Sequence, residues 1–136
     1  MITGLSHITL SITDLARSFT FYVDALGCKP LARWPKGAYL AAGDAWLALV
    51  VEDATRSGPL PEYTHMAFRV DRLTFDAMAT RIRAAGTRIF QENATEGDSL
   101  YFLDPDGHKL EIHVGDLDSR LAAARQNPWP GLELFV

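Results

Sequence analysis

The stretch that decides the fold is SHITLSI at residues 6–12, because the chain returns to the same pattern at residues 63–70 as YTHMAFRV. Polar and apolar side chains alternate in both stretches, which is the period of a β-strand with one buried face. A stripe of apolar residues at helical spacing follows each stretch and ends at Gly27 or Gly86. The sequence therefore predicts an internal repeat.

Three further strand candidates follow each predicted helix, so both halves have the order β-α-β-β-β. They lie at residues 30–34, 37–42 and 45–51 in the first half, and at 87–91, 99–103 and 109–114 in the second. We expect one α+β domain over residues 1–136, with modules at 4–51 and 63–114, a linker at 52–62, and a helix (117–126) and tail within 115–136. One such module is too small to bury both faces of its sheet, so the two modules must pack on each other or on a second chain, and we expect them to be paired across a homodimer.

The composition excludes several classes of protein. Hydrophobic residues make up 48% of the 136, and 13 basic against 17 acidic residues give a net charge of −4, with no basic cluster. Such a chain is neither disordered nor built to bind nucleic acid. A single cysteine, Cys28, excludes a disulfide framework, and with no histidine near it in sequence it is not expected to be a nucleophile. The longest apolar run, residues 45–51, is too short to span a membrane, and no signal peptide is visible, so we expect a cytoplasmic protein with no membrane partner.

Two histidines occupy equivalent positions in the repeat. His7 and His65 stand in the two matching strands, and Glu111 alternates with apolar neighbours in the last strand of the second half. Two imidazoles and one carboxylate on rigid strands are typical of a divalent metal site with open coordination positions. A carboxylate in a strand that lines a core is costly unless it is paired or bound to a metal. We predict a metal site made by His7, His65 and Glu111.

The same reasoning leaves alternatives open. The counterpart of Glu111 in the first half is Ala48 or Leu49, and neither can bind a metal, so the site has three protein ligands and an open position, which indicates catalysis. His113 lies on the same strand face as Glu111 and is the rival third ligand. His108 follows the turn at residues 104–107 and is interpreted as structural or solvated. The polar loop at residues 93–99 is either a plain loop or a site for a monovalent cation or an oxyanion.

Several motifs together carry a family resemblance over almost the whole chain. They are GLSHITL (4–10), ARW (32–34), GAYL (37–40), YTH (63–65), EGDS (96–99), YFLDPDGHKLE (101–111), HVGDL (113–117) and SRL (119–121). With the duplicated plan, they resemble the vicinal oxygen chelate superfamily, which includes glyoxalase I, extradiol dioxygenases and bleomycin-binding proteins. Within it they are most similar to the fosfomycin glutathione transferases. DPDGH alone is common in the superfamily, whereas the combination is specific.

The resemblance implies an enzyme that opens the epoxide of fosfomycin, or of a related phosphonate, with glutathione. It implies Mn(II) bound by His7 of one subunit and by His65 and Glu111 of the other. Thr9, Tyr39 and Arg120 would be catalytic, Arg120 pairing with the phosphonate and Tyr39 with the glutathione thiol. Other implied substrate contacts are Trp46, Gln91, Thr95, Ser99 and Tyr101; implied glutathione contacts are Trp34 and Lys36 beside Tyr39. Asn93, Thr95, Glu96, Gly97 and Ser99 would form a potassium loop.

The chain departs from the pattern of these transferases in three places, and other activities remain as alternatives. Gln91 stands where a lysine is usual, Ala94 where an arginine is common, and Val50 where a serine is found. The epoxide hydrolases of the superfamily use a glutamate near the start of the third strand, and residues 36–39 hold no carboxylate, so water addition ranks below thiol addition. Bacillithiol is another possible thiol. An alternative of another class is a drug-sequestering protein of the bleomycin-resistance type, which generally lacks the triad.

Overall fold

The computed structural model describes all 136 residues and contains two four-stranded sheets. The first half holds β1 (His7–Ile12), α1 (Leu15–Thr20), the π-helical turn η1 (Phe21–Ala25), β2 (Lys29–Trp34), β3 (Gly37–Ala42) and β4 (Ala45–Val51). The second holds β5 (Met66–Arg69), α2 (Arg72–Ala84), β6 (Ile89–Gln91), β7 (Ser99–Leu103) and β8 (Lys109–His113), and α3 (Leu117–Gln126) follows. The strand orders, β1-β4-β3-β2 and β5-β8-β7-β6, are equivalent, which confirms the predicted α+β plan of two β-α-β-β-β modules. None of the helices is long and apolar enough to cross a membrane.

The strand register shows which residues of the two halves correspond. β1 pairs in parallel with β4, and β5 pairs in parallel with β8. The residue two places after His7 is opposite Ala48, and the residue two places after His65 is opposite Glu111. Ala48, and not Leu49, is therefore the counterpart of Glu111.

The first helix differs from the single α-helix that its apolar stripe predicts. The α-helical part ends at Thr20, and the chain then winds more widely, so that the Leu26 amide donates to the Phe21 carbonyl at 3.2 Å. This wider turn lets the neighbours Phe21 and Tyr22 both point into the core, with their rings 5.2 Å apart. Gly27 ends it at φ 73°, a backbone conformation that favours glycine.

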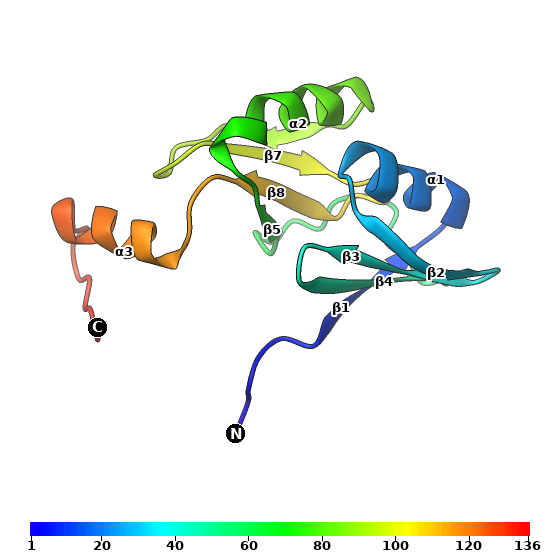
Figure 1. Ribbon diagram of the computed structural model, residues 1–136, viewed down its shortest axis with the longest axis horizontal. Coiled ribbons are helices and arrows are strands. Elements are labelled where there is room, and N and C mark those ends of the chain that lie inside the picture. The colour runs from blue at the N-terminus through cyan, green and yellow to red at the C-terminus, as the bar shows by residue number, and fades with distance from the viewer.

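The helices of both halves pack together on one side of the two sheets. Figure 1 shows α1 and α2 next to each other above the strands, and the Arg81 guanidinium donates to the Ala25 carbonyl at 2.8 Å between them. One apolar cluster joins the two halves, from Leu47 of the first sheet through Tyr22 and Ile82 to Phe102 of the second. The opposite face of each sheet carries no helix of this packing, and α3 extends away from the second sheet.

The turn at residues 104–107 fastens the second half to the first. The Asp106 carboxylate is buried and accepts from the Thr13 hydroxyl at 2.6 Å and from the Arg17 guanidinium at 3.1 Å. Its neighbour Asp104 accepts from the Tyr22 hydroxyl and from His108 Nδ1, both at 2.7 Å. We call this turn the junction turn. Burying a carboxylate costs free energy unless such donors are present, so these hydrogen bonds fix the position of the junction turn against α1 and η1.

Hydrogen bonds at the junction turn also shift proton affinities. Burial alone would raise the pKa of Asp104, but hydrogen bonds from His108 and Tyr22 outweigh it and leave the pKa below its usual value. Burial and the neighbouring Asp104 charge raise the pKa of Tyr22 well above its usual value, so its hydroxyl remains a donor. His108, expected to be structural or solvated, is in fact buried and structural.

We expect Asp104→Asn to lower the free energy of unfolding at neutral pH by about 1–3 kcal/mol, because a charged acceptor is lost from a buried network. A carboxyl whose pKa is depressed in the folded state contributes stability above its unfolded pKa, and that contribution is lost as the pH falls through the folded value. Urea denaturation at successive pH values below about 4 should therefore show a steeper loss in the wild type than in Asp104→Asn. Asp44→Asn, in an exposed turn, is the matched control and should behave like the wild type. If the free energy of unfolding falls equally steeply with decreasing pH in the wild type and in Asp104→Asn, this account is contradicted.

Candidate metal and substrate site

Two of the three predicted metal ligands meet on the second sheet. His65 lies directly before β5, and its Nε2 is 3.2 Å from Oε2 of Glu111 on β8. The Nδ1 of His65 lies 3.0 Å from the Tyr63 carbonyl, which can only accept, so Nδ1 carries a hydrogen. In the neutral ring, the lone pair of Nε2 then faces a carboxylate oxygen. A cation between these two atoms satisfies both, and this donor set fits a divalent metal.

The other carboxylate oxygen of Glu111, Oε1, accepts a hydrogen bond within the second sheet. The Ser99 hydroxyl on β7 donates to Oε1 of Glu111 at 2.6 Å, and His113 Nδ1 lies 2.7 Å from the same hydroxyl oxygen. His113 was the rival third ligand, but its Nδ1 is engaged by Ser99, and no three His, Cys, Asp or Glu residues of the chain gather as a metal site. The Glu111 carboxylate is thus buried and fixed in orientation.

His7 lies on the other sheet, away from this pair. Its side chain is exposed on β1, with Nδ1 3.1 Å from the Ser6 hydroxyl and its ring 4.5 Å from that of Trp46. A single chain therefore brings His65 and Glu111 together and leaves His7 apart. This is the arrangement needed if one chain supplies His7 and a second chain supplies the other two ligands.

Aromatic rings cross the first sheet in a row that begins at His7. Trp46 follows it, then Tyr39 at 5.2 Å and Trp34 at 4.8 Å, so the row runs from β1 over β4 and β3 to β2. Each of the three aromatic side chains is more than a third exposed. The predicted residues Thr9 and Lys36 are exposed beside this row, on β1 and in the β2–β3 turn. We call this surface the aromatic face.

The loop at residues 92–98 is folded on itself beside the second sheet. Asn93 organises it: its side-chain oxygen accepts from the Thr95 amide and hydroxyl, and its side-chain nitrogen donates to the Gly97 carbonyl at 2.8 Å. The Oε2 atom of Glu96 is buried without a hydrogen-bond donor and lies 3.7 Å from Nε of Arg120 on α3. A buried acceptor with no donor is the chemistry that fits a cation.

Tyr63 is a site residue that the sequence interpretation missed. Its carbonyl binds His65, its ring lies 4.8 Å from the His65 ring, and its hydroxyl accepts from Gln91 Nε2 at 2.9 Å. Its place two residues before His65, which gives it the same parity in the strand predicted at residues 63–70, was the available signal. The Tyr101 ring lies 6.0 Å from the His65 ring, and burial raises the pKa of the Tyr101 phenol, which stays a hydrogen-bond donor.

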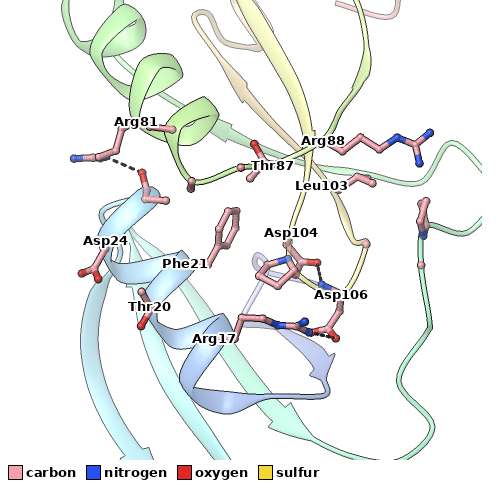
Figure 2. Close-up of a pocket in the computed structure, with 18 of the residues that line it drawn as sticks. Arg17, Thr20, Phe21, Asp24, Arg81, Thr87, Arg88, Leu103, Asp104 and Asp106 are labelled. Carbon is pink, nitrogen blue, oxygen red and sulfur yellow. Dashed lines mark hydrogen bonds and ion pairs between the residues drawn. The ribbon is translucent and has the colours of Figure 1, made fainter.

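The largest hollow of the chain is not at these residues. It measures about 1040 Å³ and lies between α1, the end of α2 and the junction turn, as Figure 2 shows. No predicted site residue lines it, and Arg17 and Arg81 on its wall are engaged with Asp106 and the Ala25 carbonyl. Cys28 is also outside the site; it is buried, and burial raises the pKa of its thiol to about 11.

Comparison with known proteins shows the family of the chain. Residues 4–112 match the model of the glyoxalase/bleomycin resistance protein/dioxygenase superfamily. The chain belongs to this superfamily. It is 47% identical to the glutathione transferase FosA of Serratia marcescens, over 97% of this chain and 95% of that protein. It is 39% identical to the metallothiol transferase FosB of Shouchella clausii, over 90% and 87%.

A solved structure narrows the family further. A mutant of the fosfomycin resistance protein FosX from Listeria monocytogenes, complexed with Mn(II) and 1S,2S-dihydroxypropylphosphonic acid, superposes with a TM-score of 0.78 and is 31% identical. The match covers 90% of this chain and 98% of that one. Within the superfamily, the chain is therefore a member of the fosfomycin-resistance proteins, a family of fosfomycin-modifying enzymes.

Proposed function

We propose that this protein is a metal-dependent transferase that opens the epoxide of fosfomycin, or of a related phosphonate, by adding glutathione. The observation that carries the proposal is the His65–Glu111 pair, in which an imidazole nitrogen and a buried carboxylate oxygen meet at 3.2 Å. The 47% identity to a glutathione transferase supports glutathione as the thiol. A glutathione-using enzyme of this kind would work in the cytoplasm.

We propose that two copies of the chain complete the metal site. His7 of one copy would join His65 and Glu111 of the other, which accounts for its exposure on a separate sheet. Ala48, the register counterpart of Glu111, supplies no fourth ligand and leaves an open position for substrate. When bound, Mn(II) would act as a Lewis acid that stabilises the negative charge on the oxygen of the opening epoxide.

The side chains around this pair suit a phosphonate anion. Arg120 offers a planar fork of donors that matches two phosphonate oxygens. The hydroxyls of Ser99 and Tyr101 lie on the same side of the second sheet as Glu111, and Thr9 would approach from the other copy with His7 and Trp46. Gln91 and Thr95 border the same region through Tyr63 and Asn93.

A monovalent cation fits the loop at residues 92–98. Glu96 presents a buried oxygen without a donor, beside Arg120. We propose K⁺ as its partner, with Asn93, Thr95, Gly97 and Ser99 completing the loop. The cation would offset the charge of Glu96, so that the Arg120 guanidinium is available to the phosphonate instead.

The aromatic face would receive the thiol substrate. The Tyr39 ring lies between those of Trp34 and Trp46, and its hydroxyl would donate a hydrogen bond to the glutathione sulfur and favour the thiolate. The Lys36 ammonium carries the charge that the glutathione carboxylates need. The thiolate then attacks an epoxide carbon, the carbon–oxygen bond of the ring breaks, and the released alkoxide takes up a proton.

The proposal is tested by phosphorus NMR of fosfomycin incubated with the protein and Mn(II), with and without glutathione. We expect a thiol adduct that requires both Mn(II) and glutathione. A diol formed without thiol would identify a hydrolase instead, and an adduct only with bacillithiol would change the cosubstrate. Stoichiometric binding without turnover would indicate a drug-sequestering protein.

The shared site makes a second prediction, about mixtures of inactive variants. His7→Ala and Glu111→Ala should each abolish turnover as homodimers. A heterodimer of the two contains one intact site, since the His7 of one chain meets the Glu111 of the other. After denaturation and refolding of an equal mixture, about a quarter of the wild-type activity should return. If mixing restores nothing while mixed dimers are present, the site is not shared in this way.

The Gln91 departure yields a third prediction. Gln91→Lys adds a positive charge beside Tyr63, and we expect a lower KM for fosfomycin because the phosphonate is an anion. Gln91→Met is the matched control: it removes the hydrogen bond to Tyr63 without adding charge, and it should not lower KM. Steady-state kinetics at constant glutathione measures both. An unchanged or higher KM for Gln91→Lys would contradict the charge argument.

A further inference from the structure

The imidazole of His113 occupies a closely fitted place behind the predicted metal ligand Glu111. Ser99 has one hydroxyl hydrogen, and the structure directs it to Oε1 of Glu111 at 2.6 Å. The Ser99 oxygen must then accept from His113 Nδ1, which lies 2.7 Å away. The three side chains form a directed chain of hydrogen bonds, from His113 through Ser99 to Glu111.

Two glycines make the room that this ring needs. Gly97 and Gly115 both have positive φ, 78° and 139°. A Cβ on Gly97 would meet the Val114 carbonyl oxygen first and would stand 3.0 Å from the His113 Cε1 atom, and one on Gly115 would stand 2.8 Å from His113 Nε2 and 3.0 Å from the Ser119 hydroxyl oxygen. The His113 side chain is 14% exposed as a result. The backbone at both glycines therefore approaches the His113 ring more closely than a residue with a Cβ would allow.

The two glycines belong to the segments that carry Glu96 and Arg120, two charged residues of the predicted site. Gly97 is in the loop with Glu96, and Gly115 is in the connection to α3, which carries Arg120. The backbone supports the same meeting point, because the Val114 amide donates to the Asp98 carbonyl at 2.9 Å. His113 thus sits where the loop, β8 and the start of α3 converge.

We propose that His113 is a positioning residue for the metal site: its Nδ1–H holds the Ser99 hydroxyl on Glu111 and so fixes the carboxylate that binds the metal. The role rests on the proposed function, since it presumes that Glu111 is a metal ligand. Groups that orient a ligand in this way commonly change metal affinity by about 10–100-fold when removed. In the free protein, the Ser99 hydroxyl would donate to Glu111. When substrate binds, Ser99 would still lie beside the phosphonate.

The test compares Mn(II) affinity, measured by electron paramagnetic resonance titration without substrate, in two variants of similar size. Asparagine can place its side-chain amide nitrogen near the position of Nδ1, whereas leucine has the same shape and no donor. We expect His113→Leu to weaken Mn(II) binding roughly tenfold or more, and His113→Asn to remain close to the wild type. Thermal unfolding and the dimer content of each variant show whether the fold is retained.

A double-mutant cycle shows whether His113 acts through Ser99. In the Ser99→Ala background, His113→Leu should have little further effect on Mn(II) affinity, because the link is already cut. Full additivity of the two effects, or an unchanged affinity in a folded His113→Leu variant, overturns the positioning role and leaves the proposed function intact. A wild type that does not bind Mn(II) overturns both.

A second measurement is independent of the metal. Long-range ¹H–¹⁵N NMR of the imidazole side chains reports which ring nitrogen carries hydrogen. At neutral pH and without metal, we expect a proton on His113 Nδ1, and this proton should lose its hydrogen bond in Ser99→Ala. An Nδ1 without a proton in the wild type would overturn the proposal. This result depends neither on the folding of a variant nor on Mn(II) binding.

Discussion

The burial of Asp104 and Asp106 in the junction turn is the interaction on which the rest of the structure depends. These carboxylates take their donors from Thr13, Arg17 and Tyr22 of the first half and so hold the second half against α1 and η1. A buried charge that loses its partners is strongly destabilising, so the two halves have little freedom to pack in another way. The helices α1 and α2 therefore pack together within one chain, and His7 and His65 remain apart in different halves.

This packing explains why a single chain looks incomplete. Trp34, Tyr39 and Trp46 lie exposed in one row, which is an unusual use of large aromatic side chains on a small protein. His65 and Glu111 lie close together in the other half, and no third His, Cys, Asp or Glu side chain completes a metal-binding cluster with them. A second copy that lays its first sheet against this second sheet would address both deficiencies at once. In the proposed site, the division of ligands between two copies would thus follow from the packing at the junction turn.

Most of the fold was predictable because the strands are specified locally. Alternation of polar and apolar residues needs no tertiary information, and strands such as β3, β4 and β7 begin and end where the sequence predicts. The π-helical turn at Phe21–Ala25 was not predictable in this way. Its cause is the burial of two adjacent rings, Phe21 and Tyr22, and the second of these is drawn to Asp104, a residue 82 positions away. Such a demand appears only when both halves are in place.

The site was predictable to the same extent, and for a related reason. The repeat makes His65 and Glu111 conspicuous, but the roles of Tyr63 and His113 depend on which atoms face each other across strands. Strand parity alone made His113 a rival ligand, because it cannot show that the Ser99 hydroxyl is hydrogen-bonded to both that ring and Glu111. Register decides another open point, since it makes Ala48 the counterpart of Glu111. The duplicated scaffold supplies a histidine from each half but a carboxylate from only one, and in the proposed metal site this single difference would leave a coordination position open to substrate.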